Sequence, residues 1–405
     1  MQTMMRKAIP LAAFMAAGLL AGDSWPGFRG DGSSLTSARG LPVAWSDRSN
    51  VAWSVGLEGY GQSSPVILGG TVYVTSTVGS RKETLVTAAY RLSDGKLAWL
   101  DRRPSSAPTE AHERLSNAAP TPVADKHGVY AFFESGDLIG LDHEGKQRWA
   151  RFLPRSDENW VGRHGLGGSP VLSGDRLFLH VAPFGGGRVY AIANEDGRDV
   201  WVRDLPPAPS FSTPVIIQHE GRSLLLTTAG GGVAAYDSEN GEELFRRPGR
   251  GGRGYAVPSA GVAGGMVVIA SGEAGGTHAF RLDAPDATLW TAEKATTEFS
   301  SPLIAGERVW LVNSVGVLFE LDLQTGQEVS TRRLPSGCWA TGISDGKRLY
   351  FFGVDGTAAV LSESSGETVA TSRLSTEGRV YGVAAAEGSF VVRTGNRLVR
   401  IASEP

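Results

Sequence analysis

Short apolar runs, each about the length of a β-strand, recur along almost the whole chain and are separated by turn-forming residues. Each repeat opens with a small residue, a proline and an apolar residue, and we call this triplet the anchor. Clear anchors stand at Ser64-Pro65-Val66, Thr121-Pro122-Val123, Ser169-Pro170-Val171, Thr213-Pro214-Val215 and Ser301-Pro302-Leu303. Degenerate anchors stand at Ser259-Ala260-Gly261, Thr341-Gly342-Ile343 and Tyr381-Gly382-Val383. Successive anchors are 40 to 57 residues apart, which indicates one repeated unit.

A second motif follows each anchor: apolar residues, often Asp, two or three polar residues, Gly, and then an apolar residue and often Trp. It is clearest at residues 90–99, 138–149, 189–201 and 233–245, and weaker at 278–290, 318–329 and 358–369. Each copy predicts two strands joined by a tight turn, because Gly allows positive φ and Asp bonds its own backbone. Asp142, Asp237 and Asp322 are therefore interpreted as turn-capping residues.

About four short strands in each repeat of roughly 40 to 50 residues is the period of a propeller blade. We predict an all-β, eight-bladed propeller of four-stranded antiparallel blades, with seven blades as the alternative because three anchors are degenerate. The last repeat lacks an outer strand, and residues 51–55, which include Trp53, are predicted to complete it. Such closure removes sheet edges that could otherwise aggregate. Trp99, Trp149, Trp201 and Trp290 recur at one blade position and are predicted to pack between blades.

The first residues have the order of a secretory signal peptide. Arg6 and Lys7 precede an apolar stretch at residues 8–21, which is shorter than the ~20 residues of a spanning helix. We expect a signal peptide at 1–24, a lead-in at 25–50, the propeller at 51–405 and no transmembrane span in the mature chain. A lipoprotein box is incomplete, since Asp23 stands where that box needs Cys. The expected location is secreted or periplasmic.

Composition excludes several kinds of site. The 405 residues contain a single Cys and carry a formal net charge of −3. One Cys excludes an internal disulfide and a Cys-based metal site, and the charge gives no reason to expect nucleic-acid binding. The sequence contains no G-x-S-x-G, H-E-x-x-H or C-x-x-C motif, so none of these catalytic motifs points to an enzyme.

The turn motif resembles the repeat of quinoprotein dehydrogenases, A-x-D-x-x-T-G-x-x-x-W, most closely at residues 321–326 and 92–99. The opening phrase at residues 25–30, WPGFRG, resembles the lead-in of secreted bacterial propellers of this superfamily. One branch of the superfamily oxidises alcohols or sugars with pyrroloquinoline quinone and calcium. Another is non-catalytic and includes the propeller lipoprotein of the outer-membrane barrel-assembly machinery. Alcohol-oxidising members carry two adjacent cysteines, whereas this chain has only Cys338.

These observations favour a non-catalytic envelope propeller that acts as a binding or protein-interaction scaffold, with no cofactor and no metal expected. The alternative is a degenerate oxidoreductase that depends on pyrroloquinoline quinone and calcium. The expected partner is an envelope protein or peptide, and the propeller is expected to be monomeric. Loops before the anchors should line one mouth of the central channel, where Arg and aromatic side chains typify binding hot spots. The candidate residues are Arg163, His164, Phe211, Arg250, Arg253, Tyr255, Trp339, Arg379 and Tyr381. Alternatively, these aromatic side chains fill the channel and the arginines are solvated charges.

Overall fold

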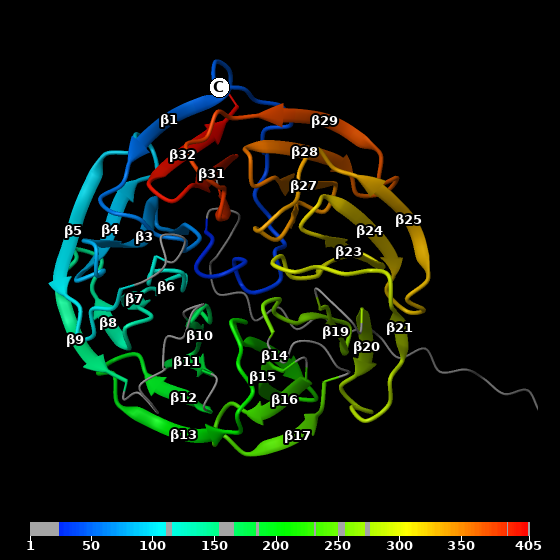
Figure 1. Ribbon diagram of the computed structural model, residues 1–405, viewed down its shortest axis with the longest axis horizontal. Coiled ribbons are helices and arrows are strands. Elements are labelled where there is room, and N and C mark those ends of the chain that lie inside the picture. Colours follow the sequence, from blue (N-terminus) through cyan, green and yellow to red (C-terminus); the bar gives the residue numbers. More distant parts are fainter. Residues whose placement is uncertain are drawn as a thin grey trace, which may run out of the picture.

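The computed structural model describes residues 24–110, 116–153, 166–183, 186–230, 232–249, 256–271, 276–386 and 388–403. They form eight four-stranded antiparallel sheets that succeed one another around a ring (Figure 1). This arrangement confirms the predicted eight-bladed propeller over the seven-bladed alternative. No helix long and apolar enough to cross a membrane occurs among these residues.

Each blade runs from an innermost strand at the channel to an outermost strand at the rim, and its strands are named in that order. Blades 1 to 4 comprise β2 (Val66–Leu68), β3 (Thr71–Val78), β4 (Thr84–Arg91), β5 (Leu97–Pro104); β6 (Val123–Asp125), β7 (Gly128–Phe132), β8 (Asp137–Leu141), β9 (Gln147–Phe152); β10 (Val171–Ser173), β11 (Arg176–Val181), β12 (Gly187–Ala193), β13 (Asp199–Leu205); and β14 (Val215–His219), β15 (Arg222–Ala229), β16 (Gly232–Asp237), β17 (Glu243–Arg247). Blades 5 to 8 comprise β18 (Gly261–Ala263), β19 (Met266–Ile269), β20 (Thr277–Arg281), β21 (Trp290–Ala292); β22 (Leu303–Ala305), β23 (Arg308–Val312), β24 (Val317–Asp322), β25 (Glu328–Arg333); β26 (Ile343–Ser344), β27 (Arg348–Phe352), β28 (Thr357–Ser362), β29 (Thr368–Arg373); and β30 (Gly382–Ala386), β31 (Ser389–Arg393), β32 (Arg397–Ala402), β1 (Val51–Gly56).

The ring closes through the first strand of the chain. β1 pairs antiparallel with β32, from Val51 opposite Ile401 to Gly56 opposite Arg397. In Figure 1 the blue β1 accordingly lies beside the red β32. The predicted outer strand at 51–55 is therefore confirmed and extends one residue further, to Gly56.

The first residue of the anchor links each of blades 1 to 6 to the blade that follows it. The backbone N–H of Ser64 donates to Thr121 Oγ1 (2.9 Å), and that of Thr121 donates to Ser169 Oγ (3.0 Å). The hydroxyls of Thr213, Ser259, Ser301 and Thr341 accept the equivalent bond from the first residue of the preceding anchor, with lengths of 2.9 to 3.0 Å. The hydroxyl group thus explains why Ser or Thr opens the anchors of blades 2 to 7. In blade 8 the position holds Tyr381, which takes a different role.

Tryptophan residues of the outer strands pack against the turn of the following blade. The indole nitrogens of Trp53, Trp99, Trp149, Trp201 and Trp290 each donate to a carbonyl of that turn, over 2.6 to 3.0 Å. The turn glycine lies against the ring, as Gly241 does against Trp201. There φ is +72°, and an added Cβ would lie 2.6 Å from the indole. The predicted packing of tryptophan between blades is confirmed. The turn caps are confirmed as well, because Asp142, Asp237 and Asp322 each accept backbone N–H groups of their own turns.

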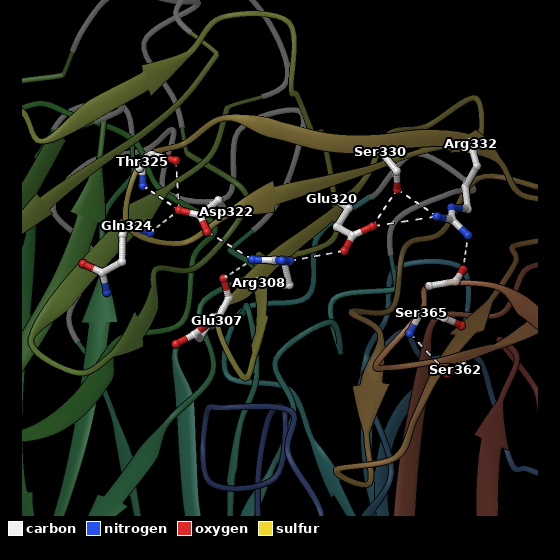
Figure 2. A network of polar contacts seen from close by, with 11 residues as sticks. Glu307, Arg308, Glu320, Asp322, Gln324, Thr325, Ser330, Arg332, Ser362 and Ser365 are labelled. Carbon is white, nitrogen blue, oxygen red and sulfur yellow. Dashed lines mark hydrogen bonds and ion pairs between the residues drawn. The ribbon is translucent and has the colours of Figure 1, made fainter.

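The interface between blades 6 and 7 lacks this tryptophan and holds a polar network instead (Figure 2). Ser330 pairs with Glu320 across the sheet, where Trp201 of blade 3 pairs with Ala191. Glu320 accepts a hydrogen bond from Ser330 Oγ (2.6 Å) and forms ion pairs with Arg308 (3.4 Å) and Arg332 (3.7 Å). Arg332 also donates to the carbonyl of Gly366, the turn glycine of blade 7.

The N-terminal segment enters the centre of the ring before it reaches β1 (Figure 1). Arg29 is buried there and donates to the carbonyls of Ala260 (3.1 Å) and Pro302 (3.0 Å), in blades 5 and 6. Trp45 then stacks on Phe352 of blade 7 at 5.5 Å and contacts Phe390 of blade 8 at 6.0 Å between ring centroids. The lead-in therefore contacts blades 5 to 8 before the chain reaches β1.

Candidate functional site

The loops before the anchors place one equivalent residue per blade at the same end of the channel. The residue two positions before each anchor is, from blade 1 to blade 8, Gln62, Ala119, Gly167, Phe211, Val257, Phe299, Trp339 and Arg379. Large aromatic and cationic side chains thus occupy this position in blades 6, 7 and 8, whereas blades 1 to 3 carry a polar or small residue. The resulting site is asymmetric although the fold is nearly symmetric.

Five side chains from blades 6, 7, 8 and 1 form a continuous cluster, which we call the mouth cluster: Phe299, Trp339, Arg379, Tyr381 and Tyr60. The ring centroids of Phe299 and Trp339 are 4.6 Å apart, and those of Trp339 and Tyr381 are 5.3 Å apart. The guanidinium carbon of Arg379 lies over the Trp339 ring, 4.9 Å from its centroid. Such cation–π contacts hold an arginine in place while leaving its N–H groups able to bind.

Tyr60 and Tyr381 join the two ends of the repeat array. Their hydroxyl oxygens are 2.5 Å apart, and their rings meet edge to face at 6.2 Å. Burial raises the pKa of Tyr60, and its bond to Tyr381 raises it further, so Tyr60 remains a neutral phenol. Tyr381 stands where the other anchors have Ser or Thr, so the break in the hydroxyl series of the anchors coincides with this pair.

Arg393 of β31 lies buried beside the two tyrosines. It donates to the backbone carbonyls of Ser63 (3.2 Å) and Thr75 (2.7 Å) in blade 1, and also to Ser63 Oγ. Burial lowers the pKa of Arg393 to about 9, and the neighbouring tyrosines partly oppose this shift. Because Arg393 belongs to blade 8 and its acceptors to blade 1, it fixes the two blades that support Tyr381 and Tyr60.

Solvent reaches the cluster mainly at Phe299 and Arg379. The Phe299 side chain is 39% exposed, and Arg379 is exposed while Trp339, Tyr381 and Tyr60 are half-buried. Among the residues described, no carboxylate lies within ion-pair distance of Arg379. An apolar surface next to an arginine without a carboxylate partner is suited to a ligand that carries an apolar group beside a negatively charged one.

The predicted site residues fall into three groups. Trp339, Arg379 and Tyr381 lie together in the mouth cluster. Phe211 occupies the equivalent loop position in blade 4, across the ring from blade 8, and its backbone N–H donates to Ala256 (2.7 Å). Arg163, His164, Arg250, Arg253 and Tyr255 lie outside the described residues.

Sequence reasoning missed Tyr60, Arg393 and Glu134 as parts of this end of the channel. Glu134, in the loop between β7 and β8, is buried and accepts the N–H groups of Ala119 (3.2 Å) and Leu166 (2.8 Å). Burial raises its pKa to about 7, and the two backbone bonds partly oppose the shift. Glu134 thereby connects the loops that precede the anchors of blades 2 and 3. The one sequence signal that could have pointed to Glu134 was its position just after a strand of the buried sheet.

Comparison with known sequences identifies the family. Residues 15–164 and 159–332 match the family described as outer membrane protein assembly factor BamB. The chain belongs to this family. The resemblance to quinoprotein-like propellers, and to their outer-membrane assembly branch, is therefore confirmed.

Individual relatives of the family are distant. BamB of Alkalilimnicola ehrlichii is 28% identical over 190 residues, which cover 46% of this chain and 43% of that protein. The match thus spans less than half of that relative. The crystal structure of BamB from Moraxella catarrhalis superposes with a TM-score of 0.62 at 15% identity, over 87% of this chain and 99% of that one. A europium-containing methanol dehydrogenase superposes with a TM-score of 0.53 at 10% identity, over 93% and 90% of the two chains. At these identities the two structures share the fold alone.

Proposed function

We propose that this protein is a non-catalytic propeller of the cell envelope that acts as a protein-interaction scaffold, with the mouth cluster as its partner-binding site. Membership of the BamB family supports an envelope role, because the family carries the description of an outer membrane protein assembly factor. The observation that carries the site is the cluster itself: stacked aromatic rings, an exposed arginine over one of them, and a rigid propeller below.

The chemistry of the cluster suits a protein surface better than a diffusible metabolite. Phe299 offers an exposed apolar ring, and Arg379 offers N–H donors to a carboxylate at the rim. Tyr, Trp and Arg dominate the binding energy of many protein interfaces. A partner segment with an acidic side chain beside an apolar one would satisfy both groups together.

The oxidoreductase alternative requires a site for calcium and for a planar tricarboxylate cofactor. Within the described ranges, no group of three or more His, Cys, Asp or Glu side chains is arranged to hold a metal ion. Trp339, an aromatic side chain that could serve as a platform, is already in contact with Phe299 and Arg379. We therefore place the oxidoreductase second to the scaffold.

The decisive experiment compares partner capture by matched variants. Tagged protein is used to capture envelope proteins as the wild type, as Trp339→Ala, as Arg379→Ala, and as Arg333→Ala. Arg333 is an exposed arginine at the end of the outer strand β25 and serves as the control. We expect at least one envelope protein to be captured by the wild type and Arg333→Ala and to be reduced about tenfold or more by either mouth variant. Equal capture by all four proteins would contradict the proposed site.

The cofactor alternative is tested separately by thermal unfolding of the wild type with pyrroloquinoline quinone and calcium. A ligand present at 100 times its Kd stabilises by about 2.7 kcal/mol. A saturable rise in Tm that Trp339→Ala abolishes would favour the oxidoreductase over the scaffold. We expect no rise in Tm.

A further inference from the structure

The N-terminal segment adds to the inner edges of the blades by backbone pairing. Trp25 N–H donates to the carbonyl of Ile67 (2.7 Å), and Ile67 N–H donates back to Trp25 (2.9 Å). One residue later, the carbonyl of Pro26 accepts the N–H of Ala124 (2.9 Å). Two consecutive residues thus bridge the inner strands β2 and β6 of adjacent blades. Thr36 and Ser34 pair in the same way with Ser344 of β26 (2.8 and 3.1 Å).

These pairing groups recur at a fixed position of the repeat. Ile67, Ala124 and Ser344 are each the third residue after the first residue of an anchor. In an antiparallel pair, the peptide groups of alternate residues point away from the partner strand. The residues at this position therefore direct their N–H and C=O groups toward the channel.

Leu172 of blade 3 and Ile216 of blade 4 occupy the same position and have the same register. Leu172 stands opposite Leu177 and Ile216 opposite Leu225, as Ile67 stands opposite Val72. No hydrogen bond from the backbone N–H of either residue to a channel-side partner is found among the described residues. Both residues are half-buried. The inner edges of β10 and β14 are thus unpaired at these residues in the described part of the chain, whereas the N-terminal segment pairs with the inner edges of the neighbouring β2 and β6.

These unpaired edges border a pocket of about 1480 Å³. The walls include Val171, Leu172, Val215 and Ile216 of the two inner strands, and Phe28 of the N-terminal segment also lines the pocket. Gly70 and Gly174, in the turns after β2 and β10, also line it. Because these turns lie at the opposite end of the inner strands from the anchors, the pocket and the mouth cluster are at opposite ends of the channel.

We propose that this pocket binds an extended polypeptide segment of a partner, which pairs with the peptide groups of Leu172 and Ile216 as Trp25 and Pro26 pair with those of Ile67 and Ala124. Strand addition of this kind takes affinity from main-chain bonds and specificity from alternate side chains. The apolar walls require apolar side chains at alternate positions. Asp31, Asp125 and Glu144 outnumber Lys126 among the charged lining residues, so neutral or basic flanking residues fit best. The proposal does not depend on the function proposed for the mouth cluster.

The first test uses a labelled ten-residue probe peptide that alternates valine and threonine between two terminal lysines. Binding to the full-length protein is followed by fluorescence anisotropy, and the same peptide with methylated backbone nitrogens is the control. We expect saturable binding of the unmodified peptide and at least tenfold weaker binding of the methylated one. Absence of saturable binding, or equal binding of both peptides, would overturn the proposal.

The second test removes one donor from the protein. Leu172→Pro deletes the N–H that faces the channel and leaves the bonds between β10 and β11 intact, a change that an edge strand accepts. Val262→Pro is the matched control, because Val262 holds the same repeat position in blade 5 and does not line the pocket. We expect Leu172→Pro to raise the Kd of the peptide about three- to tenfold and Val262→Pro to leave it unchanged.

Hydrogen exchange provides a readout that does not require a variant to fold. In the wild type, the amides of Leu172 and Ile216 should exchange more slowly when the peptide is bound, whereas the amide of Val262 should not change. Slowing at all three amides alike would indicate general stabilisation and would contradict strand addition. Loss of peptide binding in Trp339→Ala, together with unchanged exchange at Leu172 and Ile216 in the wild type, would place the peptide at the mouth cluster and would overturn the proposal.

Discussion

Between blades 3 and 4 the indole of Trp201 covers the turn glycine Gly241, whereas between blades 6 and 7 the guanidinium group of Arg332 covers Gly366. The two turn glycines have almost the same backbone, with φ of +72° and +67°. The blade geometry is therefore set by the turn and the strand register, and an aromatic ring or a charged network can fill the space beside it. The first contact depends on buried apolar area, and the second on hydrogen bonds and ion pairs around Glu320 (Figure 2).

The largest difference should appear when each interface loses its central side chain. Trp201→Ala removes a ring that is 7% exposed together with its bond to Ser238, and should lower the free energy of unfolding by about 3–5 kcal/mol. Ser330→Ala removes a hydroxyl bonded to Glu320 and Arg332, both of which keep other partners, and should cost about 1 kcal/mol. Urea unfolding of the two variants measures both values. Equal losses would show that Trp201 does not carry the interface.

The same two interfaces differ in how their polar groups are paired, which predicts a pH effect. His180 of β11 is buried between blades 3 and 4, and neither ring nitrogen has a hydrogen-bond partner among the described residues. Burial lowers the pKa of His180 to about 4 from 6.5, and Arg246 adds to the shift. The unfolded chain therefore binds a proton between pH 6.5 and 4 that the folded protein does not bind. Stability should fall by about 3 kcal/mol across this range as the pH decreases.

His180→Leu should remove this part of the acid sensitivity and cost little at pH 7, since no hydrogen bond is lost. The measurement is the free energy of unfolding against pH for the wild type and His180→Leu. The difference between the two curves isolates His180, because other groups such as Glu134 contribute to both. Parallel curves would contradict the assignment.

A matched pair of glycine substitutions gives the smallest effect and the sharpest comparison. Gly241→Ala and Gly366→Ala place a Cβ on similar backbones, so the cost of positive φ is nearly shared. At Gly241 the Cβ would lie 2.6 Å from the fixed indole, whereas at Gly366 it would lie 2.9 Å from the end of a flexible arginine. Gly241→Ala should therefore cost about 1–2 kcal/mol more than Gly366→Ala. Thermal unfolding of both variants tests this, and an equal decrease in Tm would mean that the indole moves aside.

The repeat made the fold readable from the sequence. Anchors and turn motifs recur at one period, so the blades, the tryptophan contacts and the closure by β1 were all predicted. Position relative to the anchors also predicted part of the candidate site. Trp339 and Arg379 stand at a fixed offset from their anchors, and Tyr381 stands at an anchor itself.

Contacts made by residues that do not follow the repeat could not be predicted from the sequence. Tyr60 lies four residues before the first anchor and meets Tyr381 across 321 positions of sequence. Arg393 lies in a strand whose pattern indicates apolar core, and its burial depends on carbonyls of blade 1. The path of the lead-in through the channel follows from non-repeating residues such as Arg29 and Trp45. No local pattern specifies such contacts.

The pairing of Val51 with Ile401 also determines the order in which the molecule can be assembled. The outer strand of the last blade is made first, and its partner is made last. A chain that emerges from its amino end must keep residues 51–56 unpaired until β32 is available, and closing a loop of this length carries an entropic cost that shorter hairpins avoid. Blades 1 to 7 can form earlier from local hairpins. Completion of blade 8 is then the late step, and until it occurs the edge of β32 stays open to other strands.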